Sequence, residues 1–187
     1  MRLETERLIL REWRKADCDD LVEGLNNLDV SRWLARVPFP YTAACAANWI
    51  AFYAKGVDEA NDQSDYFFAI ELKDGNKVIG GTSLERISRF HGTAGGGIWL
   101  NARYHGFGYG TEAFDRRIAF AFDELGLRRL ENGFFEGNDA SWRMQEKLGY
   151  VREGVRRQGM RCLADGLIKD EILTGLLKEE WRSINGQ

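Results

Sequence analysis

At residues 100–112 the chain reads Leu100-Asn101-Ala102-Arg103-Tyr104-His105-Gly106-Phe107-Gly108-Tyr109-Gly110-Thr111-Glu112, with glycine at every second position from 106 to 110. The apolar segment 98–100 before it is typical of a strand. Apolar residues at helical spacing follow at 113–125, and Gly126 is placed to end that helix. Glycines let backbone approach a ligand, and a helix N-terminus attracts anions. The stretch therefore predicts a turn that binds phosphate or pyrophosphate.

Two common nucleotide-binding turns do not fit these residues. The P-loop needs lysine and then serine or threonine after its last glycine, whereas Gly110 is followed by Thr111 and Glu112. The dinucleotide fingerprint needs glycine at position 111 and an early β-α-β unit, and the chain has neither. The remaining solution is the pyrophosphate of coenzyme A, and the alternative is a turn with a purely structural role.

The composition predicts one cytoplasmic domain spanning residues 1–187. A chain of this length with 44% hydrophobic residues buries a core of its own. We expect neither a membrane span nor a signal peptide, because no apolar run is long enough and residues 1–4 lack the signal pattern. Cys18, Cys45 and Cys162 are odd in number and lack ligand spacing, which favours a reducing compartment and no metal. A net charge of −3 argues against a nucleic-acid partner.

Hydrophobic patterning and turn residues predict how strands and helices alternate. Strands are expected at 7–13, 66–72, 77–86, 98–100, 127–136, 150–162 and 167–177, and helices at 17–28, 42–53, 113–125 and 138–149. Loops are expected at 88–97 and at 57–65, and the second loop is acidic and solvated. This order predicts a single α/β domain with a mixed sheet and helices on both faces.

Several short motifs occur in a characteristic order: Thr5-Glu6-Arg7-Leu8-Ile9-Leu10-Arg11, Val78-Ile79-Gly80-Gly81, the segment 106–113, Asn138-Asp139-Ala140-Ser141, Glu146-Lys147-Leu148-Gly149-Tyr150, Glu153-Gly154, Asp170 and Glu180-Trp181. Together they resemble the GNAT N-acetyltransferase superfamily, and most of all its RimJ/RimL-type branch of ribosomal-protein N-terminal acetyltransferases. The resemblance covers nearly the whole chain. It implies a mostly antiparallel central sheet and transfer of an acetyl group from acetyl-CoA to a primary amine, by direct attack in a ternary complex.

The resemblance also implies which residues bind acetyl-CoA. The strand ending at Trp99, Leu100 and Asn101 would bond the pantetheine arm through its backbone, and one N–H there would face the thioester carbonyl. The pyrophosphate loop would comprise His105, Gly106, Phe107, Gly108, Tyr109, Gly110 and Thr111, with Arg103 as an alternative basic residue. The Asn138 amide would contact the arm, and its alternative role is a helix cap.

The same resemblance implies candidates for the chemistry. Many relatives carry a tyrosine where this chain has Gln145, so we expect Ser141 to act as hydrogen-bond donor to the leaving thiolate. The alternative for Ser141 is an ordinary serine in a first helical turn. Residues 94–97 lack the glutamate that relatives often place there, which leaves Glu85 as the expected base, with a plain surface role as the alternative. Glu136 and His91 remain further alternatives.

For the acceptor, Trp33 and Phe39 flank a proline-containing loop that would form one wall of the pocket in the resembled fold, whereas Trp49 and Tyr53 are expected in the core. Few carboxylates are available as a base. An α-amino group, with a pKa of about 8, needs less help than a lysine amine at about 10.4. We therefore expect a protein or peptide N-terminus as acceptor and a monomer or homodimer. The alternatives are a small-molecule amine (polyamine, antibiotic or amino-acid analogue) and a non-catalytic acyl-CoA-binding module.

Overall fold

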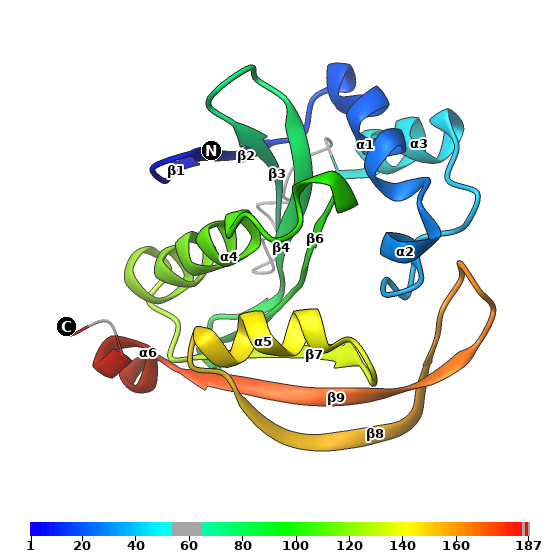
Figure 1. Cartoon of the computed structure of the whole chain (residues 1–187). Coiled ribbons are helices and arrows are strands. Elements are labelled where there is room, and N and C mark those ends of the chain that lie inside the picture. The colour runs from blue at the N-terminus through cyan, green and yellow to red at the C-terminus, as the bar shows by residue number, and fades with distance from the viewer. Residues whose placement is uncertain (54–64, 185, 187) are drawn as a thin grey trace.

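The computed structural model describes residues 1–53, 65–184 and 186 (Figure 1). Most of the expected acidic loop at 57–65 lies outside these residues. Nine strands form one sheet, whose hydrogen-bonded order is β1-β2-β3-β4-β5-β7-β9-β8, with β6 paired to β4 beside this path. The strands are β1 (Arg2–Glu4), β2 (Leu8–Glu12), β3 (Tyr66–Leu72), β4 (Val78–Ser88), β5 (Thr93–Gly95), β6 (Ile98–Leu100), β7 (Arg129–Phe135), β8 (Val151–Arg161) and β9 (Ile168–Leu177).

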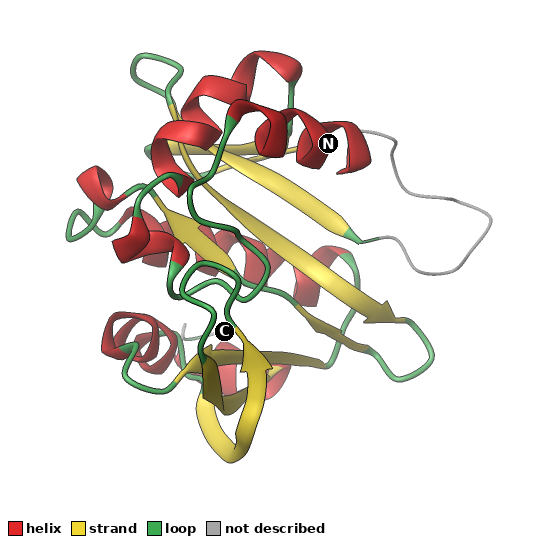
Figure 2. Cartoon of the chain, turned by 90° about the vertical axis from the view of Figure 1, so that its right-hand side faces the viewer, coloured by secondary structure: helices red, strands yellow, loops and turns green. Residues whose placement is uncertain are grey.

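The helices cover both faces of this sheet (Figure 2). They are α1 (Cys18–Leu25), α2 (Leu28–Ser31), α3 (Ala43–Tyr53), α4 (Tyr109–Ala119), α5 (Asp139–Lys147) and α6 (Lys178–Ile184), and a π-helical turn, Phe120–Glu124, extends α4. Every strand pair is antiparallel except β5 with β7. The prediction of a mixed, mostly antiparallel α/β fold is confirmed. Within the described ranges, no helix combines the length and apolar character that crossing a bilayer demands.

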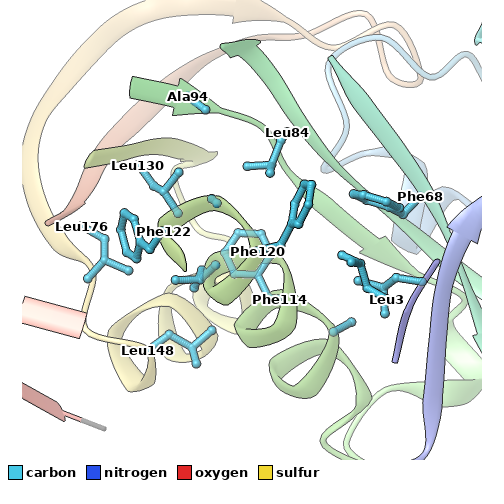
Figure 3. Close-up of a cluster of buried hydrophobic side chains, with 14 of the residues drawn as sticks. Leu3, Phe68, Leu84, Ala94, Phe114, Phe120, Phe122, Leu130, Leu148 and Leu176 are labelled. Carbon is cyan, nitrogen blue, oxygen red and sulfur yellow. The ribbon is translucent and has the colours of Figure 1, made fainter. Parts of the chain in front are cut away.

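Alternation along the strands separates two hydrophobic cores. Phe68 and Ile70 of β3 face α4, where Phe114, Phe120 and Phe122 fill the space under the helix (Figure 3). Ala69, between them in sequence, faces the opposite side and belongs to the core under α1 and α3. A strand with both faces buried in this way fixes which helices lie on which side.

The structure differs from the elements expected from local sequence at several places. The helix expected at 17–28 corresponds to α1 but ends at Leu25. A separate short helix, α2, begins at Leu28, and Asn27 caps it by accepting a hydrogen bond from the Asp29 N–H at 2.9 Å. Strand β5 lies in the expected loop 88–97, because its short, glycine-rich segment forms a strand only by pairing with β4 and β7. Strand β1 and helix α6 were not predicted.

A buried ion cluster joins the start of α1 to the sheet. The Arg11 guanidinium on β2 donates to Asp17 at 2.8 and 2.9 Å and to Glu71 on β3 at 2.6 Å. All three residues are at most 6% exposed. The hydrogen bond to Asp17 is the largest cause of the raised pKa of Arg11, and burial opposes it. The two carboxylates therefore depend on one guanidinium for their neutralisation.

Arg11→Met should lower the free energy of unfolding by about 3–5 kcal/mol, because it leaves two buried carboxylates without their cation. Urea denaturation followed by circular dichroism measures the loss. Arg2→Met is the matched control, since the exposed Arg2–Glu4 pair contributes no more than about 1 kcal/mol. Equal stability of the two variants would show that the cluster does not hold this corner of the fold.

Candidate active site

The glycine-rich turn connects β6 to α4 in the way the sequence predicted. Gly106 and Gly108 have φ values of +83° and +82°, and Gly108 occupies the N-cap position of α4. A Cβ at Gly106 would meet no atom within 4 Å, so its backbone conformation, rather than space, requires glycine. Residues 105–108 are exposed. The turn that leads into α4 is therefore accessible to solvent, and the first residues of the helix, 109–112, are partly exposed.

An ionic clamp that was not predicted holds this turn from the N-terminal segment. The Arg7 guanidinium binds the Glu112 carboxylate at 2.6 and 2.7 Å, donates to the Phe107 carbonyl at 3.0 Å, and lies 4.4 Å above the ring of Tyr109. Thr5 Oγ1 also donates to Glu112 at 2.6 Å. Burial alone raises the pKa of Glu112, but these hydrogen bonds outweigh it and hold the pKa below its ordinary value. The clamp fixes both sides of the turn.

The sheet opens beside this turn, between β6 and β7. Strand β6 pairs with β4 through Leu100↔Gly80 and Trp99↔Gly81, and no described strand pairs with its other edge. The Asn101 N–H donates to Ile79 O at 2.8 Å and the Asn101 carbonyl accepts from Tyr104 N at 2.9 Å, so the main chain of Asn101 is fully engaged. Successive residues of a strand point their N–H and C=O groups to opposite edges. Of the three expected contacts, Leu100 is therefore the one whose backbone faces the opening.

His105 is turned toward this opening rather than toward the glycine turn. Its Nε2 lies 3.0 Å from the Leu100 carbonyl, which can only accept, so this nitrogen carries the proton. Arg103, the alternative basic residue, pairs with Glu23 at 3.1 Å and is otherwise exposed. Both side chains are thus engaged with other groups of the chain, Arg103 with Glu23 and His105 with the Leu100 carbonyl.

Helix α5 begins on the other side of the opening (Figure 1). Asn138 caps the helix, because its Oδ1 accepts from the Ser141 N–H at 3.2 Å. Gly110 brings the two sides together: a Cβ there would lie 3.3 Å from Leu100 and 3.6 Å from Met144 of α5. The helix N-terminus of α4, the end of β6 and the first turns of α5 thus converge.

The Ser141 side chain ends a chain of hydrogen bonds that reaches into the core. Thr174 Oγ1 donates to Gln145 Oε1 at 2.7 Å, and Gln145 Nε2 donates to Ser141 Oγ at 3.0 Å. Gln145 and Thr174 are each 1% exposed. In the sequence, Gln145 was notable only because many relatives carry a tyrosine at that position, and Thr174 was not predicted. The hydrogen bond between Gln145 and Thr174 joins α5 to β9, and no local pattern indicates such a contact.

A cavity of about 1020 Å³ lies on the other side of the sheet opening from helix α5. It extends to the strands on both sides of the opening. It is lined on one side by Ser83, Glu85 and Gly97 and on the other by Gly133 and Phe135, with aromatic walls from Trp33, Trp49, Tyr53, Phe67 and Trp99. Trp33, one of the two residues expected at the acceptor pocket, is among the lining residues. Phe39 does not line the cavity and is 41% exposed. Trp49 and Tyr53, expected in the core, are partly buried and also line the cavity.

Three carboxylates line this cavity: Glu85 on β4 and Glu171 on β9 lie on opposite walls, and the exposed Glu131 lies on β7. Glu85 on β4 accepts from Ser83 Oγ at 2.6 Å. Glu171 on β9, which was not predicted, accepts from Arg156 at 2.7 Å and lies across β7, where a Cβ at Gly133 would be 2.6 Å from its Oε1. The mid-strand glycine was the available signal for such a close approach. Glu136 and His91 are exposed and do not line the cavity.

A fully buried arginine supports the wall that carries Glu85. Arg117 of α4 donates to Ser83 O at 2.7 Å and to the Tyr150 hydroxyl at 3.1 Å, and it lies 3.9 Å above the Phe114 ring. Burial lowers the pKa of Arg117, which has 0% exposure. The guanidinium holds β4 at the point where its partner changes from β6 to β5. Among the described residues, no group of three or more potential ligands is placed to hold a metal ion.

Comparison with known proteins identifies the family. The family described as Acetyltransferase (GNAT) domain matches residues 7–151. The Bacillus subtilis protein YdaF, described provisionally as a ribosomal N-acetyltransferase, is 33% identical over 185 residues, which cover 94% of each chain. A GNAT-family acetyltransferase from Bacillus anthracis superposes with a TM-score of 0.82 at 23% identity, covering 96% of this chain and 100% of the other.

RimJ from Mycobacterium smegmatis, solved in complex with CoA-disulfide, has the same fold. It superposes with a TM-score of 0.79 at 17% identity, covering 96% of this chain and 87% of RimJ. The expected resemblance to RimJ/RimL-type enzymes is thus confirmed at the level of fold, and the match over residues 7–151 establishes the family. The chain belongs to the GNAT family and is an N-acetyltransferase.

Proposed function

We propose that the protein transfers the acetyl group of acetyl-CoA to the N-terminal α-amino group of a protein or peptide, by direct attack in a ternary complex. The observation that carries this proposal is the opening between β6 and β7. The N-terminus of α4 lies beside this opening, and a cavity lined by aromatic side chains and three carboxylates lies across it. A linear thioester carrier fits the opening, and an amine reaches the same point from the cavity.

The residues present fit acetyl-CoA. The exposed backbone of residues 105–108 and the first turn of α4 would bind the diphosphate, which supports the assignment of His105, Gly106, Phe107, Gly108, Tyr109, Gly110 and Thr111. The Leu100 N–H and C=O would bond the pantetheine amides in place of a neighbouring strand. The ring of His105 then has to leave the Leu100 carbonyl. The Oδ1 of Asn138 accepts the hydrogen bond of the helix cap, and its amide N–H groups would donate to the pantetheine arm.

The cavity offers a carboxylate as the base for the reaction, and a carboxylate is a weak base. This supports an α-amino group as the acceptor, because such an amine needs less help to lose its proton than a lysine amine does. Glu85 is the carboxylate proposed to take the proton from the attacking nitrogen, and it already accepts from Ser83. An α-amino group, with a pKa of about 8, is far more often neutral at pH 7 than a lysine amine at about 10.4. The provisional description of YdaF and the fold shared with RimJ point to the same class of acceptor.

Thiol release from acetyl-CoA tests the function as a whole. Peptides beginning with Ser, Ala or Met should support turnover, whereas polyamines and aminoglycosides should support much less, because their amines are mostly protonated at pH 7. The same panel with peptides acetylated at the N-terminus is the control. Faster turnover with a polyamine or aminoglycoside would identify a small-molecule acetyltransferase, and binding of acetyl-CoA without thiol release for any amine would identify a non-catalytic module.

Arg7→Met should raise the KM for acetyl-CoA roughly tenfold with little change in kcat, because loss of the charge-assisted bonds to Glu112 loosens the anion-binding turn. Steady-state kinetics at saturating peptide measures the effect. Arg116→Met is the control, since Arg116 is on the same helix but pairs with Glu124 away from the turn. An unchanged KM in the Arg7 variant would mean that the turn is ordered without the clamp.

Glu85→Gln should lower kcat/KM by roughly 100-fold, and the remaining activity should no longer depend on a carboxylate at acidic pH. The pH–rate profile with a peptide acceptor is the measurement. Glu136→Gln is the control, because Glu136 is exposed and outside the cavity lining. If Glu171→Gln shows the loss while Glu85→Gln keeps full activity, the base belongs to the β9 wall and the assignment of Glu85 is wrong.

A further inference from the structure

We propose that Gln145 and Thr174 are positioning residues, which point the Ser141 hydroxyl proton at the departing sulfur of acetyl-CoA. The proposal rests on the function proposed above and adds two buried residues that do not touch the substrates. Its physical basis is the direction of the hydrogen bonds that run from Thr174 on β9 through Gln145 to Ser141 at the start of α5.

The buried end of this chain decides its direction. A glutamine amide can be turned end for end, and both orientations give a hydrogen bond at each end. In the turned orientation the amide nitrogen would donate to Thr174, whose own proton would have no acceptor, since Gln145 is its only hydrogen-bond partner among the described residues. At 1% exposure an unsatisfied hydroxyl is costly. The Thr174 proton therefore keeps the Gln145 oxygen toward the core and the Gln145 nitrogen toward Ser141.

This direction determines what Ser141 can do. Its oxygen accepts from Gln145, so its proton points away from the core. Ser141 is partly exposed in the first turn of α5, one turn before Met144, which approaches Gly110 and Leu100 at the sheet opening. Accepting a hydrogen bond also makes a hydroxyl a better donor, because neighbouring hydrogen bonds polarise one another.

The hydrogen bond acts when the C–S bond of the thioester breaks. The nitrogen of the amine forms the new C–N bond, the C–S electron pair stays on sulfur, and Ser141 donates a hydrogen bond to the thiolate. The proton that nitrogen loses balances the thiolate, which becomes a thiol in water. Ser141 gains and loses no proton over the cycle, so its orientation is the property on which the rate depends.

A double-mutant cycle tests the proposal with full-length enzyme. Thr174→Val is nearly isosteric but removes the donor, so the Gln145 amide can turn and draw the Ser141 proton inward; kcat should fall roughly tenfold at unchanged KM for both substrates. Thr174→Ser keeps the donor and should restore most of the rate. In a Ser141→Ala background, Thr174→Val should have no further effect, because the two residues act on one step.

If Thr174→Val and Ser141→Ala multiply instead, or if Thr174→Ser is as slow as Thr174→Val, Thr174 acts through packing and the proposal is overturned. Gln145→Glu gives a second route should the valine variant fold poorly. Its carboxylate accepts from both hydroxyls and should lower kcat in the same way, and wild-type kcat in that variant would also overturn the proposal.

Absence of thiol release from the wild type would refute the proposed function itself. An active wild type with a fully active Ser141→Ala variant would instead overturn the role of Ser141 and this proposal with it, and would leave the proposed function standing.

Discussion

The structure depends on one interruption of β-pairing. Strand β4 pairs with β6 at Gly80–Thr82 and then with β5 from Glu85 onward, and none of the described strands pairs with β6 on the side of β7. Unpaired backbone groups inside a fold need partners. The opening is kept by β5, which joins β4 to β7 at one end, and by Arg117, whose guanidinium binds Ser83 of one half and Tyr150 of the other. Among the described residues no carboxylate is bonded to this buried guanidinium, so its burial is costly, and it lies at the point where the sheet divides.

Around this opening the two faces of the sheet have different chemistry. On the face of α4 and α5, helix N-termini and an exposed glycine turn supply backbone donors, which suit a phosphorylated carrier. On the face of α1 and α3, tryptophans and tyrosines line a cavity that has carboxylates on both walls. Such a cavity suits a cationic amine, because aromatic rings and carboxylates both attract a positive charge.

Local sequence was a good guide wherever one segment supplies all parts of a feature. The turn from β6 to α4, the cap at Asn138 and the two strands around Gly166 were predicted within a few residues, because glycines, caps and periodicity act on near neighbours. The clamp from Arg7 to Glu112 was not, although both residues belong to motifs that had been recognised. Their charges are ordinary surface charges until residues more than a hundred positions apart meet.

By itself, the sequence determined the α/β class, the order of the main elements and the glycine turn from β6 to α4, because propensity, turn chemistry and glycine geometry are short-range properties. Only the tertiary structure decided which backbone groups face the opening, that Asn101 is bonded to other backbone groups while the Leu100 carbonyl meets the His105 ring, and that Glu171 joins Glu85 in one cavity. It also decided the direction of the hydrogen bonds from Thr174 to Ser141. Those features depend on strand register and on contacts between distant segments, and neither is written in any local pattern of residues.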